Sequence, residues 1–166
     1  WSIPQLQENL AVALEGSGAA LSTTQTQAKQ VANEVALVVK TSGSTGDSKS
    51  VVLSSAALIA SANASHKYLG ATPGDSWSLL LPTTHIAGLN VIIRATALGS
   101  RVIDNRNTED YVDADFVSIV PTQLYKALTS DSNLLEHLTA AEAVLVGGAP
   151  LSDKLKKEAA NKHVKI

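Results

Sequence analysis

Residues 77–104 read WSLLLPTTHIAGLNVIIRATALGSRVID and carry a strand, a helix and a second strand in succession. Residues 77–81 form a short apolar run of the kind found in buried strands. Residues 86–98 have the length and apolar spacing of a helix, which Gly99 can end. Residues 101–104 then return to a strand pattern. A strand, a helix and another strand in this order predict parallel pairing, so the stretch indicates an α/β fold.

The same alternation continues on both sides of this stretch. The segment at 15–30 is rich in Gly, Ser, Thr and Gln and reads as a loop or an edge. Farther along the chain, Ser54 or Ser55 can cap the helix expected at 56–69. The expected fold is α/β, with mixed, largely parallel sheets flanked by helices. Further helices are expected at 3–14, 56–69 (ended by Gly70), 122–129, 132–140 and 152–162, and further strands at 34–40, 51–54, 116–120, 143–146 and from 164 onward.

The composition limits the classes of protein that the chain can belong to. It has 166 residues, 45% hydrophobic and 17% charged, with a formal net charge of -2. This length suffices for one domain with a sizeable core, and the charge argues against binding to nucleic acid or to an anionic membrane. No apolar run approaches the roughly 18 residues of a membrane helix, no signal peptide is visible, and no cysteine is present. We therefore expect a soluble cytoplasmic protein.

The segment 41–49, TSGSTGDSK, lies between two predicted strands and concentrates hydroxyl groups, two glycines and one lysine. Glycines let a backbone approach a ligand closely, while hydroxyl groups, backbone N–H groups and a lysine can hold phosphate oxygens. The segment is thus either a phosphate-binding loop or a plain hairpin turn. A P-loop of the nucleotide-hydrolase type is disfavoured, because Ser48 replaces its second glycine and a strand follows instead of a helix.

Four blocks of sequence occur in an order that resembles one known family. The chain resembles the adenylate-forming acyl-CoA synthetases, whose phosphate loop is usually written TSG[ST]TGxPKGV. It departs from that pattern where Ser48 replaces Pro and Ser50 replaces Gly. The blocks are TSGSTGDSK at 41–49, LPTTHIAGL at 81–89, VPTQL at 120–124 and VLVGGAPL at 144–151.

The resemblance implies ATP-dependent activation of a carboxylic acid, in two steps. The acid first attacks the α-phosphate of ATP, giving an acyl-adenylate and pyrophosphate, and coenzyme A then displaces AMP to form a thioester. ATP, Mg²⁺ and coenzyme A are the implied cofactors, and Lys49 and His85 are the implied catalytic residues. The implied phosphate-binding residues are Thr41, Ser42, Gly43, Ser44, Thr45, Gly46 and Lys49.

Within that family the chain most resembles the o-succinylbenzoate–CoA ligases of menaquinone biosynthesis, through VPTQL and the nine-residue spacing from His85 to Arg94. By this resemblance His85 lines the acyl pocket and is not a metal ligand, although a lone histidine is often only a structural residue. Arg94 stands in an otherwise apolar helix, where a guanidinium is costly unless it meets an anion. It either reaches the surface, pairs with an acid, or binds the second carboxylate of the substrate.

Two further segments are candidate parts of the substrate pocket. Thr122 and Gln123 follow a predicted strand, and Gly147, Gly148 and Ala149 follow another. In the family the latter segment lies against the adenine and the acyl group, whereas the residues alone are equally consistent with a strand-to-helix turn. The Asn105–Asp115 segment is acidic and reads as a solvated loop.

The resemblance covers only part of the family's large N-terminal domain. We expect residues 1–166 to be a partial N-terminal (adenylation) domain, without the C-terminal lid domain, and to be inactive alone. The absence of methionine, even at position 1, agrees with this expectation. Two alternatives stay open: adenylation of another aryl or fatty acid, and a non-catalytic truncated binding module. A homodimer is also left open.

Overall fold

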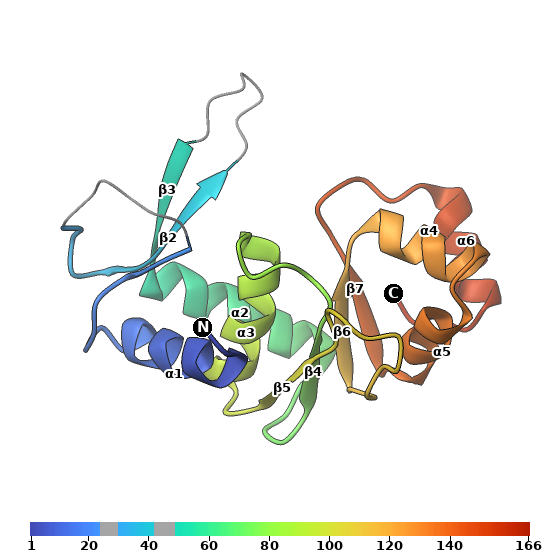
Figure 1. The fold of residues 1–166 in the computed structure, drawn as a ribbon, viewed down its shortest axis with the longest axis horizontal. Coiled ribbons are helices and arrows are strands. Elements are labelled where there is room, and N and C mark those ends of the chain that lie inside the picture. Colours follow the sequence, from blue (N-terminus) through green and yellow to red (C-terminus); the bar gives the residue numbers. More distant parts are fainter. Residues whose placement is uncertain (24–29, 42–48) are drawn as a thin grey trace.

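The structure is a computed structural model that describes residues 1–23, 30–41 and 49–166. Helices and strands alternate along most of the chain (Figure 1). The helices are α1 (Ile3–Leu14), α2 (Ser55–Leu69), α3 (Ile86–Ala97), α4 (Pro121–Thr129), α5 (Ser132–Ala140) and α6 (Asp153–Asn161). The strands are β1 (Leu21–Ser22), β2 (Val35–Thr41), β3 (Lys49–Ser54), β4 (Ser76–Leu79), β5 (Arg101–Asp104), β6 (Phe116–Ile119) and β7 (Ala143–Val146).

Two sheets organise these elements. The larger sheet has the order β5-β4-β6-β7, and all its strands are parallel. The smaller sheet has the order β1-β2-β3, with β1 and β2 parallel and β2 and β3 antiparallel. The predicted α/β fold with mixed, largely parallel sheets is therefore confirmed.

The larger sheet lies between two groups of helices, α1–α3 on one side and α4–α6 on the other (Figure 1). The first group forms one core with β4, in which α3 buries most of its apolar residues. Trp77 of β4 and Phe116 of β6 meet in that core with their rings 4.9 Å apart. The second group covers β6 and β7. Burial on both faces explains why these strands read as continuous apolar runs.

The predicted ends of α2 and α3 are confirmed by their local chemistry. The Ser54 hydroxyl accepts a hydrogen bond from the Ala57 N–H and caps α2. Gly70 ends the same helix in the left-handed conformation with φ 69°. Gly99 follows α3 with φ 66°, a conformation that favours glycine.

The 15–30 segment contains the short edge strand β1 of the smaller sheet, in agreement with the expected loop or edge. Two other expectations from the sequence are wrong. Residues 164–166 form no strand, and this segment meets the sheet through one backbone bond, from the Val144 N–H to the Lys165 carbonyl. The Asn105–Asp115 segment is not simply solvated, because Asn105 is only 1% exposed and its side chain bonds within the fold.

Asn105 belongs to a buried polar network beneath α5. Its amide nitrogen donates to the Ser78 hydroxyl (3.0 Å), which lies 2.9 Å from Nε2 of His137. His66 in the other core donates through Nε2 to the Arg94 carbonyl at 3.0 Å. Burial lowers the pKa of both histidines below its ordinary value. Both are thus held neutral in the folded state.

These two histidines predict a loss of stability in mild acid. An unfolded histidine takes up a proton near pH 6.5, whereas His66 and His137 resist it in the folded chain, so unfolded molecules bind more protons in that window. Lowering the pH from about 7.5 to about 5.5 should therefore reduce the free energy of unfolding measured in urea. The dependence of this free energy on pH should become weaker in His137→Gln. It should persist in the control His163→Gln, which changes an exposed residue. A stability that rises toward pH 5.5 would contradict the prediction.

Candidate functional site

The topology brings three of the four sequence blocks to one edge of the larger sheet. Strands β4, β6 and β7 are parallel neighbours, so their carboxyl ends lie together. His85 follows β4, Gln123 follows β6 and Gly147 follows β7. In parallel α/β sheets this edge is where ligands usually bind.

The fourth block lies on the smaller sheet. Thr41 ends β2 and Lys49 begins β3, and the two are register partners in the antiparallel pair. The block is therefore flanked by two strands, which contradicts a P-loop, because a P-loop leads into a helix. The predicted phosphate-binding residues Ser42, Gly43, Ser44, Thr45 and Gly46 lie outside the described residues.

His85 is an exposed residue at the N-cap of α3. Its N–H donates to the Pro82 carbonyl (3.3 Å) and its carbonyl accepts from the Leu89 N–H (3.2 Å), so the backbone forms a tight turn into the helix. Its side chain makes no capping hydrogen bond. The exposed imidazole therefore stands at the sheet edge beside the carboxyl end of β4.

Gly88 makes this turn sterically possible. A Cβ atom at Gly88 would lie 2.3 Å from the Pro82 carbonyl oxygen and 2.8 Å from that of Leu81. Both are backbone atoms, which cannot rotate away as a side chain does. Glycine at this position, within the LPTTHIAGL block, thus allows α3 to pack against the turn that carries His85.

Gly88→Ala should consequently destabilise the fold. Overpacking against fixed atoms typically costs about 1–3 kcal/mol, and we expect a loss of that size in urea unfolding. Gly147→Ala is the matched control, because a Cβ at Gly147 would meet nothing within 4 Å. Equal stabilities for the two variants would contradict this explanation of the turn.

Gln123 ties the ends of β6 and β4 together. Its Oε1 accepts from the Val120 N–H (3.0 Å), and its Nε2 donates to the Leu80 carbonyl (3.2 Å). The side chain is thus engaged in holding the edge in place, while the neighbouring Thr122 is exposed.

The segment after β7 is exposed and sharply turned. Gly147 donates its N–H to the Ile119 carbonyl at 3.0 Å, which continues the pairing with β6. Gly148 has φ 86°, a backbone conformation that favours glycine. Gly147, Gly148 and Ala149 leave an open surface of small residues beside Gln123.

Arg94 is in the last turn of α3, at the opposite end of that helix from His85, and its side chain contacts α2. Its Nε donates to the Ser65 hydroxyl (3.1 Å), and its guanidinium carbon lies 5.9 Å from the centre of the Trp77 ring. Burial lowers the pKa of Arg94. In the described residues the Ser65 bond is the only hydrogen bond of this side chain, and no ion pair is found for it. Pairing with a core acid is therefore not seen there.

Sequence reasoning missed two side chains near these positions. Ser65 contacts Arg94 from α2, and Arg106 after β5 donates from Nη1 to the Thr83 hydroxyl at 3.3 Å. Both contacts join residues 23 or more positions apart, so no local pattern marks them. For the Arg106 contact, the sequence offers one signal, which is the polar residue Thr83 within the LPTTHIAGL block.

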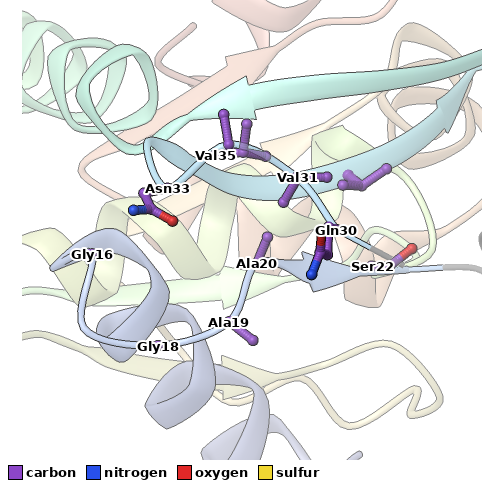
Figure 2. A pocket seen from close by; sticks show the side chains of 11 residues that line it. Gly16, Gly18, Ala19, Ala20, Ser22, Gln30, Val31, Asn33 and Val35 are labelled. Atoms are coloured by element: carbon purple, nitrogen blue, oxygen red, sulfur yellow. The ribbon is translucent and has the colours of Figure 1, made fainter. Parts of the chain in front are cut away.

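A cavity of about 700 Å³ lies away from the sheet edge, between the end of α1, β1 and the start of β2, where Ser22, Gln30 and Asn33 are its polar lining (Figure 2). A smaller cavity of about 260 Å³ borders the His85 turn through Thr83 and Thr84. Of the two, only the smaller involves residues of the sequence blocks.

Neither a metal centre nor a membrane span is found in the described part of the chain. In residues 1–23, 30–41 and 49–166 no three His, Asp or Glu side chains are grouped so that they could hold a metal ion. None of the helices there is long and apolar enough to cross a membrane.

Comparisons with known proteins agree on one family. The model of the family described as AMP-binding enzyme matches residues 3–165. A probable 2-succinylbenzoate–CoA ligase of Mycobacterium tuberculosis is 40% identical over 135 residues, covering 74% of this chain and 34% of that protein. The 2-succinylbenzoate–CoA ligase of Salmonella typhimurium is 31% identical over 175 residues, covering 98% and 37%.

Solved structures show the same relationship. An acyl-CoA synthetase (AMP-forming)/AMP-acid ligase II-like protein from Dyadobacter fermentans matches with a TM-score of 0.64 and 31% identity, over 75% of this chain and 37% of that one. The o-succinylbenzoate coenzyme A synthetase of Bacillus subtilis, in complex with AMP, matches with a TM-score of 0.61 and 27% identity, over 77% and 34%. The chain spans about a third of the length of these relatives.

Proposed function

Because the chain belongs to the AMP-binding enzyme family, we propose that it is part of an acid–CoA ligase that forms AMP. Residues 1–166 would be part of its N-terminal adenylation domain, and the lid domain would lie in the rest of the protein. The observation that carries this proposal is the placement of His85, Gln123 and Gly147 at one edge of the larger sheet. The names of the matched ligases support the same reaction class.

The proposed chemistry gives each part of this chain a role. Attack of a carboxylate on the α-phosphate of ATP forms the acyl–phosphate bond and breaks the bond to pyrophosphate, which leaves with the electron pair. Lys49 and the backbone N–H groups of residues 42–48 would stabilise the charge on the leaving phosphates. Mg²⁺ would accompany ATP and share in neutralising this charge.

The open edge suits the other partners of the reaction. Gly147, Gly148 and Ala149 present no bulky side chain, so a flat adenine or acyl group can lie against them. The exposed imidazole of His85 would border the reacting carboxylate. Gln123 would keep the ends of β4 and β6 at a fixed spacing.

We further propose that the acid is o-succinylbenzoate and that Arg94 binds its second carboxylate. A half-buried guanidinium with no acid partner in the described residues offers two Nη atoms to a carboxylate. Arg106, by contrast, already holds Asp104 through two bonds of 2.7 and 2.8 Å. The matched 2-succinylbenzoate–CoA ligases support this substrate and, with it, a role in menaquinone biosynthesis in the cytoplasm, where ATP and coenzyme A are at hand.

Arg94 also has a packing role against Ser65 and Trp77. Nine residues of helix separate it from His85 by about 13 Å of rise, so an acid that meets both side chains must be extended. If Arg94 only packs, another aryl or fatty acid would be the substrate.

Product analysis tests the reaction class directly. The full-length protein, incubated with ATP, Mg²⁺, coenzyme A and o-succinylbenzoate, should yield AMP and a thioester of the corresponding mass. AMP and thioester with a different acid would retain the ligase and replace the substrate. No product with any acid would favour a non-catalytic module.

A further inference from the structure

Arg106 connects the ends of two neighbouring strands at the proposed site. It follows β5, and its Nη1 donates to the hydroxyl of Thr83, which lies two residues before His85 and after β4. The contact spans 23 positions of sequence. This hydrogen bond links the end of β5 to the turn that carries the His85 imidazole.

The guanidinium of Arg106 is itself held in one orientation. Asp104 accepts from Nε at 2.7 Å and from Nη2 at 2.8 Å, and also from the Arg106 backbone N–H at 3.3 Å. These bonds lower the pKa of Asp104 and raise that of Arg106, so both stay charged at neutral pH. A two-pronged contact of this kind fixes the plane of the guanidinium and leaves Nη1 directed at Thr83.

The residue before Arg106, Asn105, is held in the core by hydrogen bonds. The Asn105 N–H donates to the Leu79 carbonyl at 3.1 Å, and the Asn105 amide bonds to Ser78 and to the Val112 backbone. Arg106 therefore extends from a rigid position, although its side chain is 26% exposed and that of Asp104 40%. Exposed ion pairs contribute little to stability, so the main consequence of this pair is geometric.

We propose that Arg106, oriented by Asp104, is a positioning residue that fixes the Thr83 hydroxyl and thereby the turn presenting His85. This inference rests on the proposed adenylation function. Gly88 and the Pro82 carbonyl support the helix side of the turn, and Arg106 supports its outer side. The imidazole is consequently presented by a turn supported from both directions.

Kinetics of the full-length protein test this role. Arg106→Ala should lower kcat of acid-dependent ATP–pyrophosphate exchange about tenfold, because a less firmly held His85 turn reaches the reactive geometry less often. KM for ATP and the melting temperature should not change. Arg106→Lys should not restore kcat, because a lysine keeps the charge but cannot hold Asp104 and Thr83 at once. Lys154→Ala is the control, since it removes the exposed Lys154–Glu158 ion pair on α6.

Double variants sharpen the test. Thr83→Val combined with Arg106→Ala should be no slower than Arg106→Ala alone, because both changes remove the same contact. Full kcat in Arg106→Ala, full recovery in Arg106→Lys, or additive losses in the double variant would each overturn the proposal.

A second readout separates this inference from the proposed function. Hydrogen exchange of the peptide around 82–89 should be faster in Arg106→Ala than in the parent, because the His85 N–H bond to Pro82 loses its outer support. If the parent protein shows no ATP–pyrophosphate exchange with any acid, the proposed function fails. Hydrogen exchange alone then tests the positioning role of Arg106. Unchanged hydrogen exchange of the 82–89 peptide in Arg106→Ala would overturn that role.

Discussion

Lys49→Ala should lower the rate of ATP–pyrophosphate exchange by about a hundredfold, the size of effect seen when one donor to a developing charge is removed. Lys49 begins β3 directly beside the 42–48 segment, opposite Thr41 in the antiparallel pair. We propose that its ammonium group meets the phosphates of ATP beside that segment. The measurement is exchange of labelled pyrophosphate into ATP, at saturating acid, in the full-length protein.

Lys40→Ala is the matched control for this experiment. Lys40 is an exposed lysine on the same hairpin, in register with Ser50. It carries the same charge but stands on the other strand. If the two variants lose activity equally, net charge and not position explains the effect, and if Lys49→Ala keeps full activity the phosphate role is contradicted.

Arg94→Ala should raise KM for o-succinylbenzoate about thirtyfold and leave KM for ATP unchanged, since a charge-assisted bond to a carboxylate is lost. The reason lies in the setting of the guanidinium. It is half-buried, its pKa is lowered by burial, and Ser65 occupies only its Nε. A carboxylate would supply the anion that the described surroundings of Arg94 lack.

Three variants separate binding from packing at this position. Arg94→Lys keeps the charge but not the paired donors, so it should recover only part of the affinity. Ser65→Ala removes the Nε contact and leaves the guanidinium in place. Arg101→Ala changes an exposed arginine at the start of β5 and should have no effect. If Arg94→Ala weakens all acids equally and lowers the melting temperature, Arg94 supports the packing of α2 on α3 and the substrate assignment is wrong.

The alternation of elements could be predicted from the sequence because most are marked by local chemistry. The helix at Ile86–Ala97 is marked by its apolar spacing and by Gly99, and α2 by Ser54 and Gly70. The end of the chain was predicted less well. Residues 164–166 have the composition of a strand, but a strand also needs backbone pairing, and only the Lys165 carbonyl bonds to β7.

The candidate site was predictable where motifs carry it and not where tertiary contacts do. His85 and Gly147 were found because each belongs to a block next to a strand end. The acidic residues around Asn105 predict a solvated loop, yet Asn105 is buried and bonds to Ser78, 27 positions away. The Arg106–Thr83 contact depends in the same way on the pairing of β4 with β5.

Acid-dependent ATP–pyrophosphate exchange in the longest parent chain is the most direct test of the central claim. We expect exchange with o-succinylbenzoate, and none with benzoate or a fatty acid as controls. Exchange only with another acid would keep the adenylation chemistry and discard the role of Arg94 as a carboxylate ligand. The absence of exchange with every acid, from a chain whose mass shows it to be complete, would contradict the claim that this protein adenylates carboxylic acids.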